Sequence, residues 1–247
     1  MNAPLPLEGR VALVTGGARR IGRSVALRLA ADGADVIFSY RHSRAEADSL
    51  VSEVSALGRV AQANEADVTR RDDVLRLIES AGKFRGRLDL LVNNVGMFVS
   101  KPFEQITEDD WDTMQSTNLK SEFLMCQAAA PLLRASGRGS IVNFASLGGL
   151  LAWPSHVHYC VSKAGVIMLT RCLARALAPQ IRVNAIAPGT ISFPDDAAGI
   201  AEDFIRRAPL ARTGRPEDIA GAVSYLAQAD FVTGQVLVVD GGRSIPA

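Results

Sequence analysis

The sequence predicts an α/β fold with one doubly wound parallel sheet of about seven strands and helices on both faces. Short β-rich segments alternate with helical ones along the whole chain. Several β-rich segments are continuously apolar, as expected of strands that helices cover on both faces. No linker, low-complexity segment or internal repeat divides the chain, so residues 1–247 are expected to form a single domain.

The elements follow in order along the chain. Residues 10–16 (RVALVTG) form an apolar, β-branched first strand that breaks into glycine before a helical pattern. Residues 34–40 (ADVIFSY) form the second strand, and a helix follows over roughly 44–57. The other strands are expected within 59–68, 88–96, 139–146, 181–189 and 234–242. This alternation implies right-handed crossovers and a Rossmann-like sheet.

Polar residues and glycines stand at the carboxyl ends of these strands, which is the edge where open parallel sheets bind ligands. We expect them to line a single crevice. They are Gly16, Tyr40, Asp67, Asn93, Ser146, Pro188 and Gly189.

The composition is that of an ordinary globular protein, with 48% hydrophobic and 21% charged residues and a formal net charge of +1. This balance gives no reason to expect nucleic acid or a membrane surface as a partner. The three cysteines lack the spacing of disulfide frameworks or zinc sites, which favours a reducing cytoplasm and no bound metal. We see no signal peptide, and no apolar run approaches the ~20 residues that span a bilayer.

The first strand ends in TGGARRIG, Thr15 to Gly22. A glycine-rich turn that opens a helix brings backbone N–H groups and the helix dipole to a pyrophosphate. The glycines alone leave open a tight turn without a ligand. The segment resembles the TGxxxGxG turn of the short-chain dehydrogenase/reductase family, with Arg20 where the middle glycine usually sits. The candidate cofactor contacts in this turn are Gly16, Arg19, Arg20, Ile21 and Gly22.

The end of the second strand bears on the choice of cofactor, because an acidic side chain there would bind the adenosine ribose. Tyr40 stands where NAD-preferring relatives have Asp, Arg41 follows, and Ser43 is a further candidate contact. Arg20 and Arg41 are placed to converge on a 2′-phosphate, which a carboxylate would repel. We therefore predict NADP(H), against the alternative that both arginines are solvated surface charges.

Tyr159 and Lys163 are four residues apart, which places them on the same face of a helix. A tyrosine normally ionises near a pKa of ~10, and a neighbouring ammonium favours the phenolate and lowers that pKa. The pair would then be suited to general acid–base catalysis. Taken alone the spacing is common, and a purely structural role stays open.

Further matches strengthen the family resemblance. Ser146, Asn118, NNVG (93–96) and APG (187–189) follow the short-chain dehydrogenase/reductase pattern in order and spacing. The resemblance implies hydride transfer between a nicotinamide and a carbonyl/alcohol pair on a small-molecule substrate. In it, Tyr159 would be the general acid, Ser146 would orient the carbonyl, Lys163 would bind the nicotinamide ribose, and Asn118 would support a water relay. It also implies cofactor contacts at Asp67, Val68, Asn93, Gly96, Pro188, Gly189 and Ile191.

The substrate pocket is expected to form from a different set of residues. Residues 192–212 are the expected substrate lid, and Phe193 stands where many relatives carry a threonine that contacts the cofactor. Aromatic and histidine side chains are candidates to line the pocket, with packing or surface roles equally open. They are Phe98, Trp153, His156, His158 and Phe193.

Two subfamilies compete. Chain length and the ending GGRS suit the group that includes 3-oxoacyl-[acyl-carrier-protein] reductases, but Gly137 and Gln180 fall where carrier-docking relatives have arginines; Arg134 and Arg138 are nearby. Segments such as ARRIG and YRHSRAEA resemble bacterial pteridine reductases, which carry Asp in place of Ser146 and a polar residue where this chain has Met97-Phe98. We favour a general carbonyl reductase, and a catalytically silent NADP-binding regulator is the alternative of another class.

Two helices carry more apolar surface than one sheet face can bury. Residues 160–177 have apolar side chains around more than one face, and residues 124–135 are similar. A second buried face against another subunit is therefore expected. The family's usual four-helix contact fits, so we predict a homotetramer, with a dimer as the alternative.

Overall fold

The computed structural model describes residues 4–196 and 202–245. Its centre is one seven-stranded sheet in the order β3-β2-β1-β4-β5-β6-β7, in which every neighbouring pair is parallel. The strands are β1 Val11–Val14, β2 Asp35–Tyr40, β3 Ala61–Glu65, β4 Leu90–Asn93, β5 Gly139–Phe144, β6 Ile181–Pro188 and β7 Val236–Val239. The predicted fold class and all seven strand locations are confirmed.

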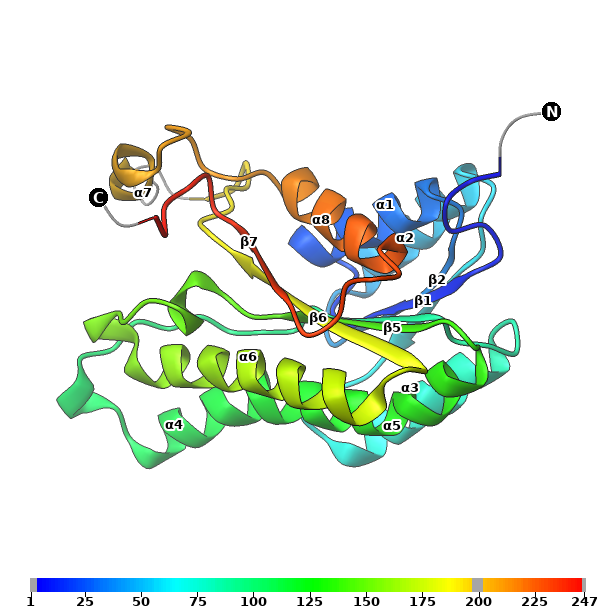
Figure 1. Cartoon of the computed structure of the whole chain (residues 1–247), viewed down its shortest axis with the longest axis horizontal. Coiled ribbons are helices and arrows are strands. Elements are labelled where there is room, and N and C mark those ends of the chain that lie inside the picture. The colour runs from blue at the N-terminus through cyan, green and yellow to red at the C-terminus, as the bar shows by residue number, and fades with distance from the viewer. Residues whose placement is uncertain (1–3, 197–201, 246–247) are drawn as a thin grey trace.

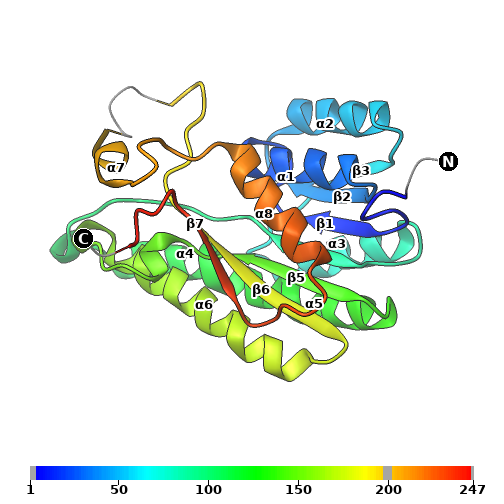
Figure 2. The same cartoon turned by 45° about the horizontal axis from the view of Figure 1, so that its top comes forward.

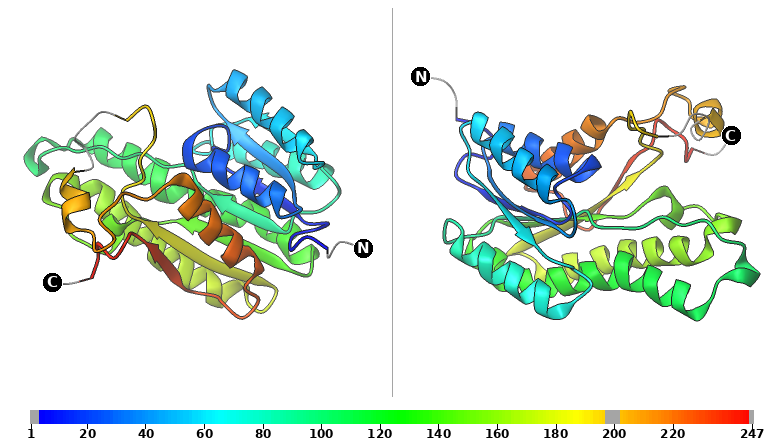
Figure 3. Two further views of the ribbon diagram at one scale, coloured as in Figure 1. Left: turned by 90° about the horizontal axis from the view of Figure 1, so that it is seen from above. Right: turned by 180° about the vertical axis from the view of Figure 1, so that it is seen from behind.

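Helices cover both faces of the sheet. In Figures 1 and 3, α1, α2 and α8 lie on one face, whereas α3, α4, α5 and α6 lie on the other. Their bounds are α1 Arg20–Ala31, α2 Arg44–Ala56, α3 Arg71–Lys83, α4 Glu108–Gln115, α5 Ser121–Ala135, α6 Val157–Leu177 and α8 Pro216–Gln228. The short helix α7, Glu202–Arg207, stands apart beyond the carboxyl end of β6, as Figure 2 shows. Short 3₁₀ turns are η1 Phe103–Gln105, η3 Leu147–Gly149 and η4 Pro154–His156.

The first strand shows why the strand sequences are continuously apolar. Ala12 and Val14 pack into the core beneath α1 and α8, while Val11 and Leu13 pack into the core beneath α3 and α5. Successive side chains of a strand point to opposite faces, so a strand between two helical layers needs apolar residues at every position. Truncating the fully buried Leu13 to Ala would cost about 2–5 kcal/mol of stability.

The loops that follow β1, β4, β5 and β6 meet at the carboxyl edge of the sheet. The chain reverses between β1 and β4, so β2 lies on one side of β1 and β4 on the other. This reversal is where doubly wound sheets open a crevice for a ligand. Within residues 4–196 and 202–245, no helix combines the length and apolar character needed to cross a bilayer.

Candidate active site

The glycine-rich turn after β1 is held by the end of β4. The Thr15 hydroxyl accepts hydrogen bonds from the backbone N–H groups of Asn94 (2.9 Å) and Val95 (3.2 Å). The Asn94 amide donates to the carbonyls of Thr15 (2.9 Å) and Gly16 (3.2 Å). A Cβ on Gly22 would lie 2.2 Å from the Gly16 carbonyl oxygen, so the turn packs directly on the start of α1. Because Gly22 places no side chain between the turn and α1, the backbone N–H groups of the turn and the N-terminus of α1 can face a pyrophosphate together.

Arg20 takes a backbone conformation that normally favours glycine, with a φ of +50°. Its side chain turns toward the segment after β6: the guanidinium lies 3.0 Å from Asp196, 3.4 Å from Asp195 and 4.5 Å from the centre of the Phe193 ring. In this structure Arg20 and Arg41 do not converge: Arg20 links the nucleotide turn to residues 193–196, at the start of the expected lid, and their meeting on one phosphate stays a prediction. The expected lid also includes residues 197–201, which lie outside the described part of the chain.

A hollow of about 370 Å³ lies at the ends of β2 and β3. Most of the predicted adenosine contacts line it: Gly16, Tyr40, Arg41, Asp67, Val68 and Gly96. Arg41 is exposed and lies 3.5 Å from the Asp67 carboxylate. Burial alone would raise the pKa of Asp67, but hydrogen bonds from Thr69 and the charge of Arg41 outweigh it and lower that pKa. Asp67 is therefore ionised and holds Arg41 at the rim of the hollow.

Arg19 and Ser43 lie outside this hollow. Arg19 pairs with Glu46 at 3.5 Å and, with Arg20 and Phe193, lines a neighbouring open depression of about 490 Å³. Ser43 precedes α2, and its side chain caps no helix N–H group. Arg19 thus presents a cation close to the turn, whereas Ser43 has no visible part in the crevice.

Asn93 differs from its predicted place. Its side chain is buried inside the sheet, where it donates to the Asn143 side chain (2.9 Å) and to the Cys126 sulfur (3.2 Å). Asn143 in turn donates to the hydroxyl of Thr170 (3.0 Å). This chain of hydrogen bonds ties β4, β5 and α6 together, so the Asn93 side chain is structural. Asn94, which the sequence reasoning passed over, lines the crevice instead.

The predicted reactive residues gather on the other side of Gly96. A second hollow, of about 270 Å³, is lined by Ser146, Tyr159, Lys163, Pro188, Gly189, Ile191 and Phe193, with Ile21, Asn94 and Gly96. The structure therefore brings together three of the four predicted catalytic side chains and the predicted contacts after β6. The Ser146 hydroxyl accepts a hydrogen bond from the Gly148 N–H (3.1 Å), which sets its direction at the end of β5.

The pKa of Tyr159 moves against the expectation. Burial raises the pKa of the phenol, and a hydrogen bond with Ser146 opposes this. The Lys163 ammonium donates to the Phe144 backbone carbonyl (2.5 Å) and lies 3.8 Å from the Glu122 carboxyl. Burial lowers the pKa of Lys163, and Glu122 raises it. The protein's own groups thus anchor Lys163 at Phe144 and keep Tyr159 protonated.

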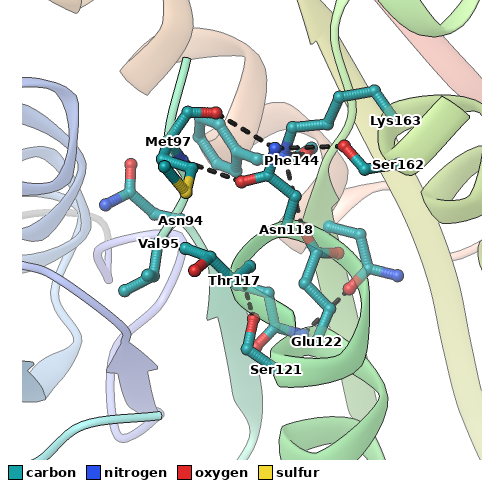
Figure 4. Close-up of polar contacts among 12 residues, drawn as sticks. Asn94, Val95, Met97, Thr117, Asn118, Ser121, Glu122, Phe144, Ser162 and Lys163 are labelled. Carbon is teal, nitrogen blue, oxygen red and sulfur yellow. Dashed lines mark hydrogen bonds and ion pairs between the residues drawn. The ribbon is translucent and has the colours of Figure 1, made fainter. Parts of the chain in front are cut away.

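Asn118 sits in an element that the sequence did not reveal. Residues Ser116–Lys120 form a π-helical turn between α4 and α5, a rare element that is frequent at functional sites. The fully buried Asn118 amide accepts from the Met97 N–H (2.7 Å) and donates to the Met97 carbonyl (3.0 Å) and to Ser162 (3.0 Å), as Figure 4 shows. Asn118 therefore joins the loop after β4 to α6, directly beneath Gly96.

A larger cleft of about 640 Å³ adjoins this hollow and is bounded by Ser146, Tyr159, the loop after β6 and α7. Phe98 and Trp153, two of the aromatic candidates, line this cleft, and their contact with a substrate stays a prediction. The Trp153 ring is parallel to the Tyr159 ring at 6.2 Å, and Phe98 stacks on His156 at 4.5 Å. His158 is buried and faces a separate small cavity beside Met97, so it is not part of the cleft.

Glu122 is a further residue that the sequence reasoning missed. It is 1% exposed and lies one helical turn after Asn118, against Lys163. The sequence feature that could have identified Glu122 is its place four residues after Asn118, where a carboxylate immediately precedes the apolar segment FLMCQAAA.

A dinucleotide fits what these residues offer. The two hollows share Gly96 and Met97, the glycine turn lies between them, and a Cβ on Gly96 would lie 3.4 Å from both Asn118 Oδ1 and Lys163 Nζ. The adenosine half would be held by residues at β2 and β3, and the nicotinamide half by Lys163 and the loop after β6. Among the residues described, no three His, Cys, Asp or Glu side chains cluster so as to hold a metal ion.

Comparison with known proteins agrees with this geometry. The family described as Enoyl-(Acyl carrier protein) reductase matches residues 16–244. A 3-oxoacyl-[acyl-carrier-protein] reductase of Synechocystis is 38% identical over 240 residues, covering 96% of this chain and 97% of its own.

Solved structures of similar proteins span nearly the whole chain as well. A short-chain dehydrogenase/reductase of Serratia marcescens superposes with a TM-score of 0.92 at 36% identity, covering 97% of this chain and 99% of its own. A blue fluorescent protein from a metagenomic library, solved in complex with NADPH, has a TM-score of 0.90 at 37% identity, with 97% and 99% covered. The chain belongs to the short-chain dehydrogenase/reductase family, and it is an oxidoreductase that acts on CH–OH/C=O groups with a nicotinamide cofactor.

Proposed function

We propose that the enzyme uses NADPH to reduce the carbonyl of a small-molecule substrate to an alcohol. The observation that carries this proposal is the shared hollow: Ser146 and Tyr159 line both the 270 Å³ hollow beside Lys163 and the 640 Å³ cleft beneath the aromatic side chains. A carbonyl held by these two hydroxyl groups faces the cofactor on one side and the substrate cleft on the other.

The proposed preference for NADP(H) is supported by charge. No carboxylate follows β2; Tyr40 and Arg41 stand there, and Arg41 is exposed at the rim of the adenosine hollow. A 2′-phosphate would compete with Asp67 for the Arg41 guanidinium, because a phosphate monoester carries more negative charge than a carboxylate and can bind the guanidinium in the same bidentate way. Arg19 presents a second cation on the side of α1. The similar NADPH-bound protein supports the same choice.

In the proposed mechanism, the Ser146 hydroxyl hydrogen-bonds the carbonyl oxygen and the Tyr159 hydroxyl protonates it. The bound cofactor supplies the hydride to the carbonyl carbon. Burial keeps the Tyr159 proton in place until a negative charge develops on the substrate oxygen 
. The Lys163 ammonium, which donates to the Phe144 carbonyl, would then face a phenolate rather than a phenol and would stabilise its negative charge. Lys163 would also hold the ribose of a bound cofactor. Asn118 fixes the loop after β4 to α6 below this site. We propose that it also supports the return of a proton through water.

The residues at the expected carrier-docking positions bear on which acyl group the substrate carries. The curated relative reduces 3-oxoacyl groups on a carrier protein, as its name states. In this chain Gly137 and Gln180 stand at the expected docking positions. Of the two nearby arginines, Arg134 is exposed, whereas the Arg138 guanidinium is held by the buried Asp89 carboxylate (3.1 Å) and by the Gly9 carbonyl (3.2 Å). Neither stands at the position where the docking relatives have their arginines. We therefore propose a general ketone or 3-oxoacyl thioester reductase that does not depend on carrier docking.

One observation favours a second candidate, reduction of a dihydropterin. Phe98 is 59% exposed and lies edge-on to Tyr159 at 4.8 Å, and the Trp153 ring is parallel to Tyr159. Flat aromatic walls of this kind suit a planar heterocycle. Ser146 offers a hydroxyl where the pteridine reductases carry a carboxylate, which weakens this candidate.

A substrate screen tests the proposal. The protein is mixed with NADPH and, in parallel, with acetoacetyl thioesters, dihydropterins and simple ketones, and the absorbance of the reduced nicotinamide is followed. We expect turnover with carbonyl compounds and slower turnover with NADH. Tight NADPH binding without turnover of any carbonyl would contradict the proposal and would favour a nucleotide-binding regulator.

We also propose that the enzyme is a homotetramer, with a dimer as the alternative, and that it works in the reducing cytoplasm, where its three free cysteines stay thiols. Apolar side chains remain exposed on α5 and α6, namely Phe123, Val161 and Met168. Figures 1 and 3 show α5 and α6 side by side in the helical layer that covers one face of the sheet. A second subunit would bury them. Sedimentation at micromolar concentration that shows only monomer would contradict this.

A further inference from the structure

A carboxyl group lies buried behind the proposed catalytic lysine. Glu122 is on α5, is 1% exposed, and places an oxygen 3.8 Å from Lys163 Nζ. In the parts of the chain that the structure describes, neither carboxyl oxygen of Glu122 has a partner at full hydrogen-bond geometry. The Phe144 backbone N–H approaches the carboxyl and lowers its pKa, but less than the charge of Lys163 does. A buried carboxyl without such partners is costly, so its charge state depends on the nearest cation. That cation is Lys163 (Figure 4).

The surroundings leave Lys163 as the main influence on Glu122. From β5, the Phe144 carbonyl accepts from the ammonium and offers no charge. From α5, the Cys126 thiol lies one turn beyond Glu122, and burial raises the pKa of that thiol so that it stays neutral. From α6, Tyr159 is a neutral phenol because burial raises its pKa. The Asn118 amide is uncharged.

We propose that Glu122 is a positioning residue that keeps Lys163 protonated at alkaline pH, and so extends the pH range of the enzyme. This inference rests on the proposed role of Lys163 in binding the cofactor and supporting Tyr159. Glu122 touches neither substrate nor cofactor, and it acts through the lysine.

The directions in which burial shifts the pKa of Glu122 and the pKa of Lys163 determine how this pair responds to pH. Burial raises the pKa of Glu122 to about 8, against the opposing charge of Lys163. Burial lowers the pKa of Lys163, against the opposing charge of Glu122. Below about pH 8 the carboxyl is neutral, and the ammonium depends on Phe144 alone. Above it the carboxylate forms, and the ion pair opposes the loss of the proton that burial favours on Lys163.

The direct test needs no turnover. The chain has four lysines, Lys83, Lys101, Lys120 and Lys163, so protein labelled with ¹³C at lysine Cε gives few resonances to follow. The Lys163 signal is assigned by its loss in Lys163→Arg. In the wild type we expect a step in this signal near pH 8 as Glu122 ionises, before the lysine itself titrates. In Glu122→Gln the step should vanish, and Lys163 should lose its proton about one pH unit or more lower.

Turnover gives a second readout. In Glu122→Gln, kcat with NADPH near neutral pH should stay within about twofold of the wild type, while the alkaline limb of the pH profile moves down by about one unit or more. Glu122→Asp keeps a carboxyl group at this position, so the alkaline limb of its pH profile should stay closer to that of the wild type. Met125→Leu, a volume-conserving change in the same buried part of α5, controls for packing and should leave the limb in place.

The outcomes are separable. A Lys163 signal without the step in the wild type, or the same Lys163 titration in Glu122→Gln as in the wild type, would overturn the inference even if the enzyme reduces carbonyls. Absence of turnover in the wild type would contradict the proposed function and would leave the lysine titration to decide the role of Glu122.

Discussion

The two ends of the crevice are built differently. At the reactive end, Ser146, Tyr159, Lys163 and Asn118 are buried, and backbone groups of Gly148, Phe144 and Met97 hold three of them in place. At the nucleotide end, Arg41 at the adenosine hollow and Arg19 and Arg20 at the glycine turn are exposed and rest on acidic side chains at 3.0–3.5 Å. The proposed catalytic groups thus lie in the interior, whereas the proposed contacts for cofactor choice are surface ion pairs that a ligand can exchange.

This difference follows from what each end has to do. A proton transfer needs groups held to within a fraction of an ångström, which burial and short backbone hydrogen bonds provide. Recognition of a phosphate needs positive charge within reach, and exposed ion pairs contribute little stability, so they are easily broken in favour of the ligand. The effects of substitutions at the two ends should accordingly differ in magnitude and in the property that changes.

The largest effect is expected at the reactive end. Tyr159→Phe removes the proposed acid and should lower kcat by about 10²–10⁴-fold, while NADPH affinity stays within about twofold, because the ring that packs beside Trp153 remains. Turnover is measured from nicotinamide absorbance, and affinity from nicotinamide fluorescence. A variant that keeps more than a tenth of the wild-type kcat would show that another group delivers the proton.

The turn that separates the two ends should be nearly as sensitive. In Gly22→Ala the new Cβ would lie 2.2 Å from the Gly16 carbonyl, so α1 must shift away from the turn, at a cost of about 1–3 kcal/mol. Thermal unfolding should report the lost stability, and NADPH affinity should fall with it. Gly82→Ala in α3, where the Cβ meets only Leu132 at 3.4 Å, is the matched control and should be neutral or stabilising. Equal behaviour of the two variants would contradict the tight packing at the turn.

An intermediate effect is expected at the rim of the adenosine hollow. Arg41→Asp removes a phosphate partner and adds a carboxylate that repels the phosphate, so the ratio of kcat/KM for NADPH to that for NADH should fall by about 10- to 100-fold. Arg76→Asp, at an exposed position on α3, is the control for surface charge. If the ratio is unchanged, Arg41 does not read the 2′-phosphate.

The smallest effect should come from Arg20. Its exposed contacts with Asp195 and Asp196 are worth about 0–1 kcal/mol, so Arg20→Ala should change the melting temperature little and the cofactor ratio by less than about threefold. A change as large as that of Arg41→Asp would mean that Arg20 leaves the lid and joins Arg41 when the cofactor binds. The comparison of the two arginines thus separates a lid contact from a phosphate contact.

Sequence patterns alone predicted the fold, the order of its elements and most of the crevice. Continuous apolar runs identify strands covered on both faces, and the residues that end parallel strands must meet at one edge. For the same reason Gly16, Ser146 and Gly189 could be placed together from positions far apart in the chain. The spacing of Tyr159 and Lys163 was sufficient to place both on one helix face, where the structure has them in α6.

Only the tertiary structure decided where side chains point and what surrounds them. Asn93 was expected in the crevice, but the neighbouring strand β5 offers it Asn143, and the adjacent Asn94 takes the crevice position. Arg20 was expected at the phosphate, but the segment after β6 brings Asp195 and Asp196 to it in this structure. Glu122 became significant only when α6 placed Lys163 against it. Periodicity records which face of an element is apolar, whereas hydrogen bonding and pKa depend on neighbours that the fold brings in from distant segments.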